Sequence, residues 1–569
     1  MNIPTNSLDY AEGHGGQLVV SALQQWGVNE IFTLSGGHVF PIYDACVKSH
    51  LPIYDVRHEQ SAAFGAEGIA KLLRRPGVCV VTAGPGVTNS MSAIASAQFN
   101  GSPLVVIAGR SPQARWGQGS LQEIDHIPFI SPITKSAYTA TNTSEIFPLV
   151  ENACNEAMTV HRGPTFVDIP IDVIYSNGIF SRSQIPESWG EKVNVSQSIN
   201  AEQDQTAIRS IEEVARLIVS SRKPLLVAGG DVWMGSAEDQ LKVLVERFQI
   251  PTFLNGQGRG ILSFDHPLCL TRTRSMLAQA ELVVVVGTPL DFRLSFGRFG
   301  DAQVVHIVDH YSRKANHLEN VITLHGDIKT TLIQLLEDAE RYVASFANSS
   351  LAHKDRQDWA TELRELESKE LESDSEIDGG GTIPIHPVRI FRELAGILDR
   401  DAIVVGDGGD FVSFAGKYVR SYEPGCWLDP GPYGCLGTSM GYLMAARIAH
   451  PTRQVVGVIG DGAFGFSAMD VDSLVRLKLP VVMVVGNNGI WGLEKHPMKA
   501  LYGYDVAADL QSECRYDQII TALGGAGEIV RDPNMIGEAI TRGFDSGVPY
   551  LVNVITDPNI VYPRSSNLA

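Results

Sequence analysis

A series of short, β-branched apolar runs limits what this chain can fold into more than any other feature of its sequence. Each run is followed by a segment with the apolar periodicity of a helix. The runs lie at residues 77–83, 103–109, 224–230, 281–287, 302–309, 402–408, 454–462 and 480–488. Strands that are apolar on both faces are typical of parallel sheets buried between helices. The sequence therefore predicts an α/β fold with doubly wound parallel sheets, repeated three times.

Two polar stretches divide the 569 residues into domains. Residues 181–203 carry no core pattern and indicate a linker. Residues 353–382 are strongly charged, favour a helix and end in three glycines, which indicates a solvated helix followed by a tether. The predicted domains are residues 1–180, 200–340 and 380–569, each near the common domain size of about 150 residues.

The charge balance narrows the classes of ligand. The chain has 45 Lys and Arg against 64 Asp and Glu, a net charge of −19, with 44% hydrophobic residues. Such a composition supports large cores and argues against disorder. A strongly acidic chain repels polyphosphate backbones, so we expect no nucleic-acid partner. Any anionic ligand has to be held by local arginines, backbone N–H groups or a metal.

The compartment is predicted from apolar runs and cysteines. No apolar run approaches the ~20 residues that span a bilayer, and residues 1–16 lack the basic start and apolar stretch of a secretory signal. The seven cysteines are scattered and form no Cys-x-x-Cys pair, which favours reduced thiols over disulfides or a zinc site. We therefore expect a cytoplasmic protein with no membrane partner.

The strongest chemical signal follows two apolar strands of the third domain. Asp461 lies in a Gly-Asp-Gly turn, and the next strand ends at Asn487-Asn488. The carboxylate of Asp461, the side-chain oxygen of Asn488 and the backbone carbonyl of Ile490 are hard ligands suited to Mg²⁺. The N–H groups of Gly462 and Ala463 would meet phosphates at a helix start. Either motif alone is more often an ordinary turn; together they predict a metal–diphosphate site.

This spacing resembles the diphosphate-binding signature of thiamine diphosphate (ThDP) enzymes. The resemblance implies a glutamate in the first domain that hydrogen-bonds the aminopyrimidine ring, and Glu59 fits it within the Arg57-His58-Glu59-Gln60 motif. The alternative is a first-turn carboxylate stabilised by the helix dipole. In this family the two motifs meet across a subunit interface, so the resemblance also implies a homodimer or homotetramer.

Further segments resemble the same family in the expected order. Residues 83–89 resemble its Ala-Gly-Pro-Gly turn beside the cofactor, and residues 434–437 resemble the segment that wedges between the two rings. Gln122 matches a glutamine that faces the substrate. The resemblance implies cofactor contacts at Pro85, Gly409, Asp410, Gly434, Leu436, Gly492 and Leu493.

The whole chain resembles the branch with acetolactate synthases, oxalyl-CoA decarboxylases and 2-hydroxyacyl-CoA lyases. Acetolactate synthases usually continue with a Gly-Met-Val-x-Gln-Trp pattern; here Glu494 replaces an apolar residue and the Gln-Trp pair is missing. Glu494 would move the hydroxyl proton of a 2-hydroxyacyl substrate, or else be a surface carboxylate paired with Lys495 or His496. His38 either polarises a substrate oxygen or is an inert, hydrogen-bonded loop histidine.

The central domain of these relatives holds FAD in synthases and an ADP-like nucleotide or the adenosine end of CoA in CoA-handling enzymes. Arginines near residues 271–298 look more like the CoA-handling side and would supply local positive charge. The alternative is solvated arginines on a vestigial domain. The expected nucleotide or CoA residues are Arg274, Asp291, Arg293, Asp309, Asp327 and Ile328.

These features favour a ThDP- and Mg²⁺-dependent 2-hydroxyacyl-CoA lyase, which yields formyl-CoA and an aldehyde or ketone. The close alternative is an acetolactate synthase-like enzyme that joins two pyruvate units and releases CO₂. A hypothesis from another class is a non-catalytic nucleotide-binding subunit of the same fold. The extended tail at residues 561–569 is either a lid over the substrate channel or a frayed terminus.

Overall fold

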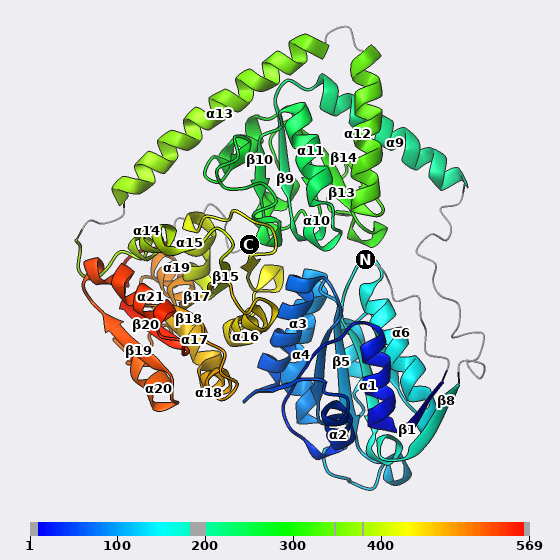
Figure 1. Cartoon of the computed structure of the whole chain (residues 1–569). Coiled ribbons are helices and arrows are strands. Elements are labelled where there is room, and N and C mark those ends of the chain that lie inside the picture. The colour runs from blue at the N-terminus through cyan, green and yellow to red at the C-terminus, as the bar shows by residue number, and fades with distance from the viewer. Residues whose placement is uncertain (1–9, 182–200, 346–348, 378–380, 563–569) are drawn as a thin grey trace.

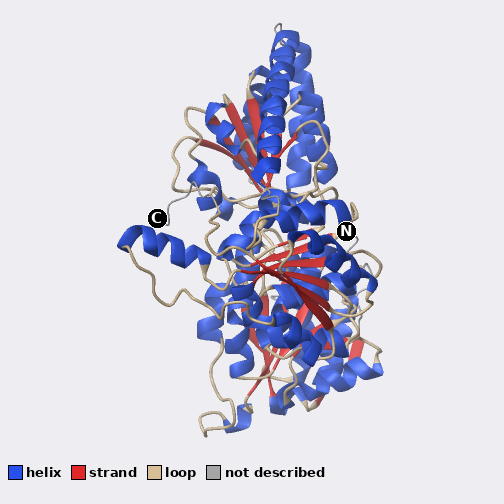
Figure 2. Ribbon diagram, turned by 90° about the vertical axis from the view of Figure 1, so that its left-hand side faces the viewer, coloured by secondary structure: helices blue, strands red, loops and turns tan. Residues whose placement is uncertain are grey.

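The computed structural model describes residues 10–181, 201–345, 349–377 and 381–562. These residues form three six-stranded sheets, and all neighbouring strands within them are parallel. Helices cover both faces of each sheet, and the three domains occupy the three corners of the molecule (Figures 1 and 2). The predicted α/β fold with three doubly wound parallel sheets is confirmed.

The first domain has the strand order β3-β2-β4-β5-β7-β6. The first and last strands of this domain along the chain, β1 (Tyr10–His14) and β8 (Asn177–Ser181), pair as a separate antiparallel ribbon. The strands are β2 (Ile31–Thr33), β3 (Ile53–Asp55), β4 (Gly77–Val81), β5 (Leu104–Arg110), β6 (Ser136–Thr139) and β7 (Thr165–Pro170). The helices are α1 (Gly15–Gln25), α2 (Phe40–Lys48), α3 (Glu59–Leu73), α4 (Pro85–Asn100), α5 (Ile127–Ile130), α6 (Ile146–Met158) and α7 (Ile171–Ile174).

The third domain has the strand order β16-β15-β17-β18-β20-β19. Counted along the chain, this is the same spatial order as in the first domain. The strands are β15 (Ile403–Asp407), β16 (Trp427–Leu428), β17 (Val455–Gly460), β18 (Val482–Asn487), β19 (Ala526–Val530) and β20 (Tyr550–Ile555). The helices are α14 (Val388–Ile397), α15 (Gly409–Tyr418), α16 (Ser439–Ala449), α17 (Asp461–Ser467), α18 (Val471–Arg476), α19 (Gly492–Tyr502), α20 (Tyr516–Ala522) and α21 (Ile536–Asp545).

The central domain differs, with the strand order β11-β10-β9-β12-β13-β14. This is the order of the dinucleotide-binding fold, in which ligands bind where the winding direction reverses. The strands are β9 (Pro224–Ala228), β10 (Thr252–Leu254), β11 (Cys269–Leu270), β12 (Leu282–Val286), β13 (Gln303–Val308) and β14 (Val321–His325). The helices are α9 (Ala201–Ser220), α10 (Gly230–Met234), α11 (Glu238–Phe248), α12 (Ile328–Ser345) and α13 (Ser349–Ile377).

The first and third domains meet along α3 and α16, which lie side by side in Figure 1. Glycines make this approach possible: a Cβ on Gly441 would lie 2.7 Å from the Cβ of Phe64, and one on Gly68 would lie 2.6 Å from the Cβ of Ala445. The two elements therefore pack closely enough to fix the start of α3, where Glu59 lies, against the third domain.

Helix α13 differs from the expectation of a solvated helix. It runs along the outer edge from the central domain toward the third (Figure 1), but Trp359 and Leu363 are buried in the central core. The Glu367 carboxylate accepts from the backbone N–H groups of residues 271–273. Asp374 pairs with Arg272 and with Lys417 of the third domain. Between its charged residues, α13 thus carries side chains that are buried in the central core, and the helix connects the central domain to the third.

Two sequence predictions fall largely outside the described residues. Of the polar stretch at residues 181–203, residues 182–200 lie outside them, and α9 begins at Ala201. Of the tail, residues 563–569 lie outside them. Its described part ends at Tyr562, whose ring meets Phe414 edge-on at 5.0 Å.

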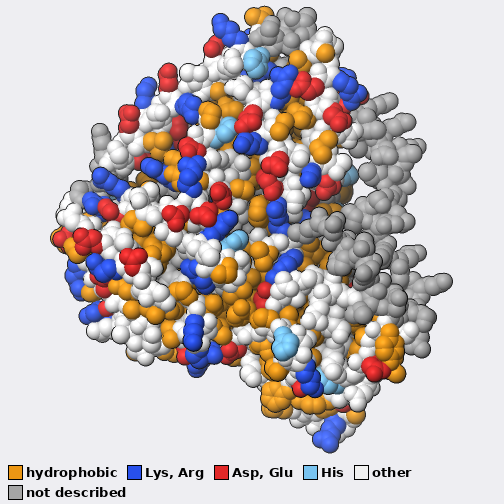
Figure 3. All heavy atoms as spheres, viewed as in Figure 1, with side chains coloured by type: hydrophobic (Ala, Val, Ile, Leu, Met, Phe, Trp, Pro, Cys, Tyr) orange, Lys and Arg blue, Asp and Glu red, His pale blue; other side chains and the backbone are white. Residues whose placement is uncertain are grey.

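The surface is mixed in charge. Figure 3 shows Lys and Arg interspersed with Asp and Glu over one face. Among the described residues, no helix combines the length and apolar character needed to cross a membrane. All seven cysteines are free thiols, as expected.

Candidate functional site

The third domain gathers its predicted metal ligands at the carboxyl ends of β17 and β18, next to the point between β15 and β17 where its winding reverses. Asp461 begins α17 and is only 3% exposed. Its two carboxylate oxygens accept from the N–H groups of Gly462 (2.9 Å) and Gly489 (2.7 Å). Burial raises its pKa to about 6, and no Lys, Arg or His of the described residues forms an ion pair with it. A divalent cation would supply the missing charge, so the site fits Mg²⁺.

Asn488 and Ile490 lie beside this carboxylate on the loop after β18. The Asn488 side-chain oxygen accepts from the Ile490 N–H at 3.1 Å. The neighbouring Asn487 has a structural role, because its amide donates to the Cys514 carbonyl (2.9 Å) and the Asn553 side chain (3.0 Å). Of the two consecutive asparagines, Asn488 is the one available to a ligand.

Two helix starts converge on the same edge. A Cβ on Gly409, the first residue of α15, would lie 2.4 Å from Leu493 Cδ1. A Cβ on Gly492, the first residue of α19, would lie 2.3 Å from an Asp410 carboxylate oxygen. The structure thus brings together four residues that the sequence placed in separate motifs. Their backbone N–H groups are suited to a diphosphate.

Sequence reasoning missed Asp407, the last residue of β15. It is fully buried, and its carboxylate accepts from the N–H groups of Gly408 (2.8 Å) and Ser439 (2.9 Å). Burial raises its pKa to about 6. Gly408 has a φ of +100°, which favours glycine. The signal was a second Gly-Asp-Gly sequence at residues 406–408.

The first domain supplies Glu59, which begins α3 and is 6% exposed. Asn89 of α4 donates to one of its carboxylate oxygens at 3.0 Å. The next residue, Gln60, donates to the Leu436 carbonyl at 3.1 Å. Leu436 is part of the predicted wedge, where Gly434 has a φ of +73°. The start of α3 is therefore tied to the wedge segment of its own chain.

His38 and Gln122, predicted from separate motifs, belong to one hydrogen-bonded group. The His38 ring nitrogen Nδ1 lies 3.0 Å from the Thr82 hydroxyl, which donates to the Gln122 side-chain oxygen at 3.3 Å. Burial, with a smaller contribution from His126, lowers the pKa of His38. Pro85 begins α4 two residues after Ala83. The side chains predicted to face substrate thus lie beside the cofactor turn.

Glu494 is exposed in the first turn of α19. The alternative interpretation paired it with Lys495 or His496, but Lys495 binds Asp505 at 3.1 Å and also Asp509. Among the described residues, no hydrogen bond or ion pair occupies the Glu494 carboxylate. Its side chain is therefore available to a ligand.

The predicted nucleotide residues of the central domain do not gather in one place. A cleft of about 50 Å³ lies at the reversal point between β9 and β12, and of the six predicted residues only Arg293 lines it. Arg293 is also paired with Asp291 at 2.7 Å. Asp309 binds His161 of the first domain at 2.8 Å. Three of the six predicted residues, Asp291, Arg293 and Asp309, thus already have protein partners.

The other three predicted nucleotide residues have different environments. Burial lowers the pKa of Arg274 to about 10. Asp327 is exposed and accepts from the Thr330 N–H at 2.8 Å. The Ile328 side chain is 1% exposed within the central core, so only its backbone could meet a ligand.

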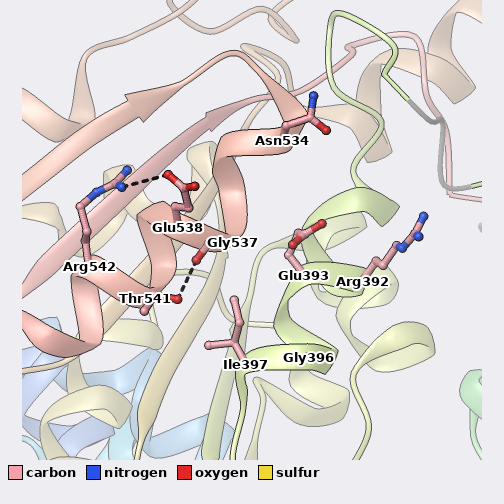
Figure 4. Close-up of a pocket in the computed structure, with 9 residues that line it drawn as sticks. All are labelled: Arg392, Glu393, Gly396, Ile397, Asn534, Gly537, Glu538, Thr541 and Arg542. Carbon is pink, nitrogen blue, oxygen red and sulfur yellow. Dashed lines mark hydrogen bonds and ion pairs between the residues drawn. The ribbon is translucent and has the colours of Figure 1, made fainter.

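A larger open groove of about 690 Å³ lies between α14 and α21. Figure 4 shows its lining, which includes Arg392, Glu393, Asn534 and Arg542. None of the residues predicted for catalysis, cofactor or metal lines this groove. It is separate from the candidate site.

Three family models match the chain. Residues 13–129 match the N-terminal TPP (thiamine pyrophosphate) binding domain of thiamine pyrophosphate enzymes, residues 211–335 match their central domain, and residues 407–554 match their C-terminal TPP binding domain. Thiamine pyrophosphate is another name for ThDP. The central match spans the whole sheet of its domain, whereas the first match ends before β6 and the third begins at the last residue of β15.

Relatives with two different names are similar over nearly the whole chain. The acetolactate synthase large subunit of Mycobacterium tuberculosis is 46% identical, with 98% of each chain covered. The 2-hydroxyacyl-CoA lyase 2 of Caenorhabditis elegans is 33% identical, covering 95% of this chain and 89% of the relative. The human 2-hydroxyacyl-CoA lyase 2 is 30% identical, with 95% and 90% covered. The similarity to the synthase is clearly the stronger.

Proposed function

Because the chain belongs to the family of ThDP enzymes, we propose that it is an acetolactate synthase-like carboligase that joins two 2-keto acids and releases one CO₂. The observation that carries this proposal is the 46% identity to an acetolactate synthase over 98% of both chains. It replaces the lyase as the favoured reaction. The sequence argument for the lyase combined Glu494 and the missing Gln-Trp pair with a CoA site in the central domain, and that CoA site finds no support. The arginines and acids expected there lie apart, and several are already paired.

We propose that Asp461, the Asn488 side chain and the Ile490 carbonyl hold Mg²⁺. The backbone around Gly409, Gly462, Ala463 and residues 492–493 would receive the diphosphate. When bound, ThDP supplies the carbon that adds to a substrate carbonyl and stabilises the resulting negative charge. The desolvated Asp461 supports this assignment, since no cationic side chain of the described residues pairs with its carboxylate.

Glu59 is proposed to hold a proton at the aminopyrimidine ring. Leu436 would wedge against the cofactor, with the Gly434 carbonyl accepting from its amino group. On the substrate side, the lowered pKa of His38 favours the neutral ring at neutral pH. Because the Thr82 hydroxyl donates to Gln122, His38 Nδ1 donates to Thr82, and Nε2 remains as an acceptor that suits a substrate hydroxyl. Gln122 would orient the same oxygen.

A 2-hydroxyacyl-CoA lyase is the second candidate, and Glu494 is the observation in its favour. This exposed carboxylate lies three residues beyond Trp491, whose ring a Cβ on Gly462 would touch at 2.5 Å. A carboxylate near the metal loop could accept the hydroxyl proton of a 2-hydroxyacyl thioester. The similarity to lyases over 95% of the chain supports the same reaction.

We propose that the active unit is a homodimer or a larger homo-oligomer. In the described residues no hydrogen bond or ion pair links Glu59 to Asp461 or Asn488. Phe466 and Met469, which follow Asp461, are 59% and 54% exposed, and Phe99 at the end of α4 is 49% exposed. Apolar side chains this exposed favour a partner surface. A second copy would cover them and would bring Glu59 to the metal site of its partner.

We also propose that the central domain binds ADP or FAD at the reversal point between β9 and β12. The strand order supports this, because dinucleotide-binding folds use that point. Release of the bound nucleotide from purified protein, with an absorbance scan for flavin, tests it. If the released material contains neither ADP nor FAD, this assignment is contradicted.

The reaction is tested by supplying purified protein, ThDP and Mg²⁺ with pyruvate or 2-hydroxyisobutyryl-CoA in parallel. Acetolactate and CO₂ from pyruvate, with the thioester untouched, are expected. Formyl-CoA and acetone from the thioester, with little acetolactate, would overturn the synthase and establish the lyase. No product from either substrate, although ThDP binds, would contradict both.

A further inference from the structure

His126 is a fully buried histidine at the start of α5 that the reaction outlined above does not use. Its ring joins the backbone of one segment of the first domain to a side chain of another. The Gly84 N–H donates to its Nε2 at 3.0 Å, and its Nδ1 lies 2.8 Å from an Asp168 carboxylate oxygen. Both ring nitrogens are therefore committed to specific partners.

These partners fix the tautomer. A backbone N–H can only donate, so Nε2 must be unprotonated to accept from Gly84. Nδ1 then carries the proton and donates it to Asp168. Arg110 donates to the same carboxylate oxygen at 2.8 Å and also pairs with Asp125 at 3.0 Å. The carboxylate is thus anchored, and it holds the imidazole with its acceptor nitrogen toward Gly84.

The Gly84 turn needs such an anchor. Gly84 has a φ of +57°, and a Cβ there would lie 3.0 Å from the backbone oxygen and Cβ of Gln122. Gln122 itself has a φ of +60°, an unusual value for a residue with a side chain. Two backbones in left-handed conformations therefore press together at the point where α4 begins.

The turn also determines the placement of catalytic groups. Pro85 is the first residue of α4, and Asn89 one turn later donates to Glu59. We propose that His126 is a positioning residue for ThDP catalysis: oriented by Asp168, it holds the Gly84 turn and thereby sets Pro85 and Asn89 against the cofactor and Glu59. This assignment rests on the proposed cofactor site.

Phe129 and Phe166 surround the ring edge-on, with ring centroids at 6.0 and 6.1 Å. If His126 only filled this apolar space, its hydrogen-bonding pattern would be immaterial. Two substitutions separate the alternatives. His126→Gln can keep an acceptor near the Nε2 position, whereas His126→Asn, one bond shorter, can keep only a donor near Nδ1.

The experiment measures ThDP affinity of wild type and both variants by tryptophan fluorescence at saturating Mg²⁺, with the melting temperature of each apo protein. His126→Asn leaves the buried Gly84 N–H without an acceptor, so we expect about 10-fold weaker ThDP binding and lower kcat, with the KM for pyruvate unchanged. His126→Gln is expected to stay within about 3-fold of wild type. Both variants should melt below wild type, because each breaks one of the two buried hydrogen bonds of the ring, so the difference in ThDP affinity between them reports the positioning role.

Equal ThDP affinity in the Asn variant and wild type, or equal losses in both variants that follow their melting temperatures, would overturn the positioning role. Wild-type protein that fails to bind ThDP would overturn the proposed cofactor site, and this assignment with it. Tight wild-type binding combined with an unaffected Asn variant would overturn the positioning role alone.

Discussion

The first and third domains share one strand order but use the carboxyl edge of the sheet in opposite ways. In the first domain the functional polar groups are satisfied within the protein: Asn89 donates to Glu59, and Thr82 joins His38 to Gln122. In the third domain Asp461 is held only by backbone N–H groups, with no cation beside it in the described residues. We call the edge in the first domain the prebuilt edge, because its polar groups already have protein partners. We call the edge in the third domain the anchoring edge, because Asp461 there would bind a positive charge from a metal. The same topology therefore supports positioning in one domain and anchoring in the other.

The largest effect is expected at the anchoring edge. Asp461→Asn removes the charge that would hold the metal, and we expect more than about 100-fold weaker Mg²⁺–ThDP binding, since even residues behind the ligands contribute 10- to 100-fold. Calorimetric titration of ThDP with excess Mg²⁺ measures it. Asp410→Asn is the matched control and should weaken binding less. Unchanged affinity in the Asp461 variant would remove the distinction between the two edges.

Glu59→Gln tests the prebuilt edge. The variant should fold, bind ThDP within about 3-fold of wild type and lose turnover by about 100-fold, because proton transfer contributes 10²–10⁴. Glu59→Gln should therefore lose turnover but keep its ThDP affinity, whereas Asp461→Asn should lose both. Steady-state kinetics beside the same titration provide the check. Full turnover in the Gln variant would contradict the role given to Glu59.

The pH dependence of apo stability sharpens the comparison. The folded pKa of Asp461, about 6, lies above its ordinary value of 3.8. Protonation of Asp461 therefore stabilises the folded state relative to the unfolded one. This contribution to the free energy of unfolding is lost as pH rises through 6. Between pH 5 and pH 7.5 we expect Asp461 to contribute a loss of about 1.4 kcal/mol in the free energy of unfolding, at 1.36 kcal/mol per pKa unit, in addition to the similar contribution of Asp407.

The melting temperature of the apo protein at these two pH values measures this loss. Asp461→Asn should lack that component. ThDP with Mg²⁺ should raise the wild-type melting temperature more at pH 7.5, because the ligand takes the ionised form. An identical pH dependence in wild type and variant would show that Asp461 is not the titrating group.

Glu494→Gln distinguishes the two candidate reactions with a smaller effect. If the enzyme is a synthase, acetolactate formation should change by less than about 3-fold, since an exposed carboxylate outside the reaction contributes little. If it is a lyase, formyl-CoA release should fall by about 10-fold or more. Product assays with both substrates distinguish the two reactions. Glu538→Gln, which changes an exposed carboxylate on α21, is the control.

The smallest effect on the site is expected from α13. Trp359→Ala empties a buried position of the central core and should cost about 3–5 kcal/mol in that domain. ThDP affinity should not change, because neither edge depends on Trp359. Thermal unfolding and the ThDP titration together test this, and a parallel loss of affinity would mean that the central domain supports the site directly.

The repeated apolar strands predicted the fold, and the Gly-Asp-Gly and Asn-Asn turns predicted which residues would gather at the third sheet. Their success has a physical cause, because carboxyl ends of adjacent parallel strands meet at one edge. His126 was missed because a single buried polar residue carries no pattern, and only packing reveals what it holds. Asp407 was missed although its Gly-Asp-Gly sequence gave a signal. The α13 prediction was wrong in detail, since Trp359 and Leu363 form too sparse a stripe among charged residues to stand out.

We propose that Glu59 of one copy acts with Asp461 of another. Mixing the inactive Glu59→Gln and Asp461→Asn proteins, after dissociation and reassembly at equal amounts, tests it most directly. Mixed dimers would contain one site with both natural residues, so activity should return to about a quarter of the wild-type value under random pairing. If each site formed within one chain, every site would carry one defect, and the mixture would stay as inactive as its parents.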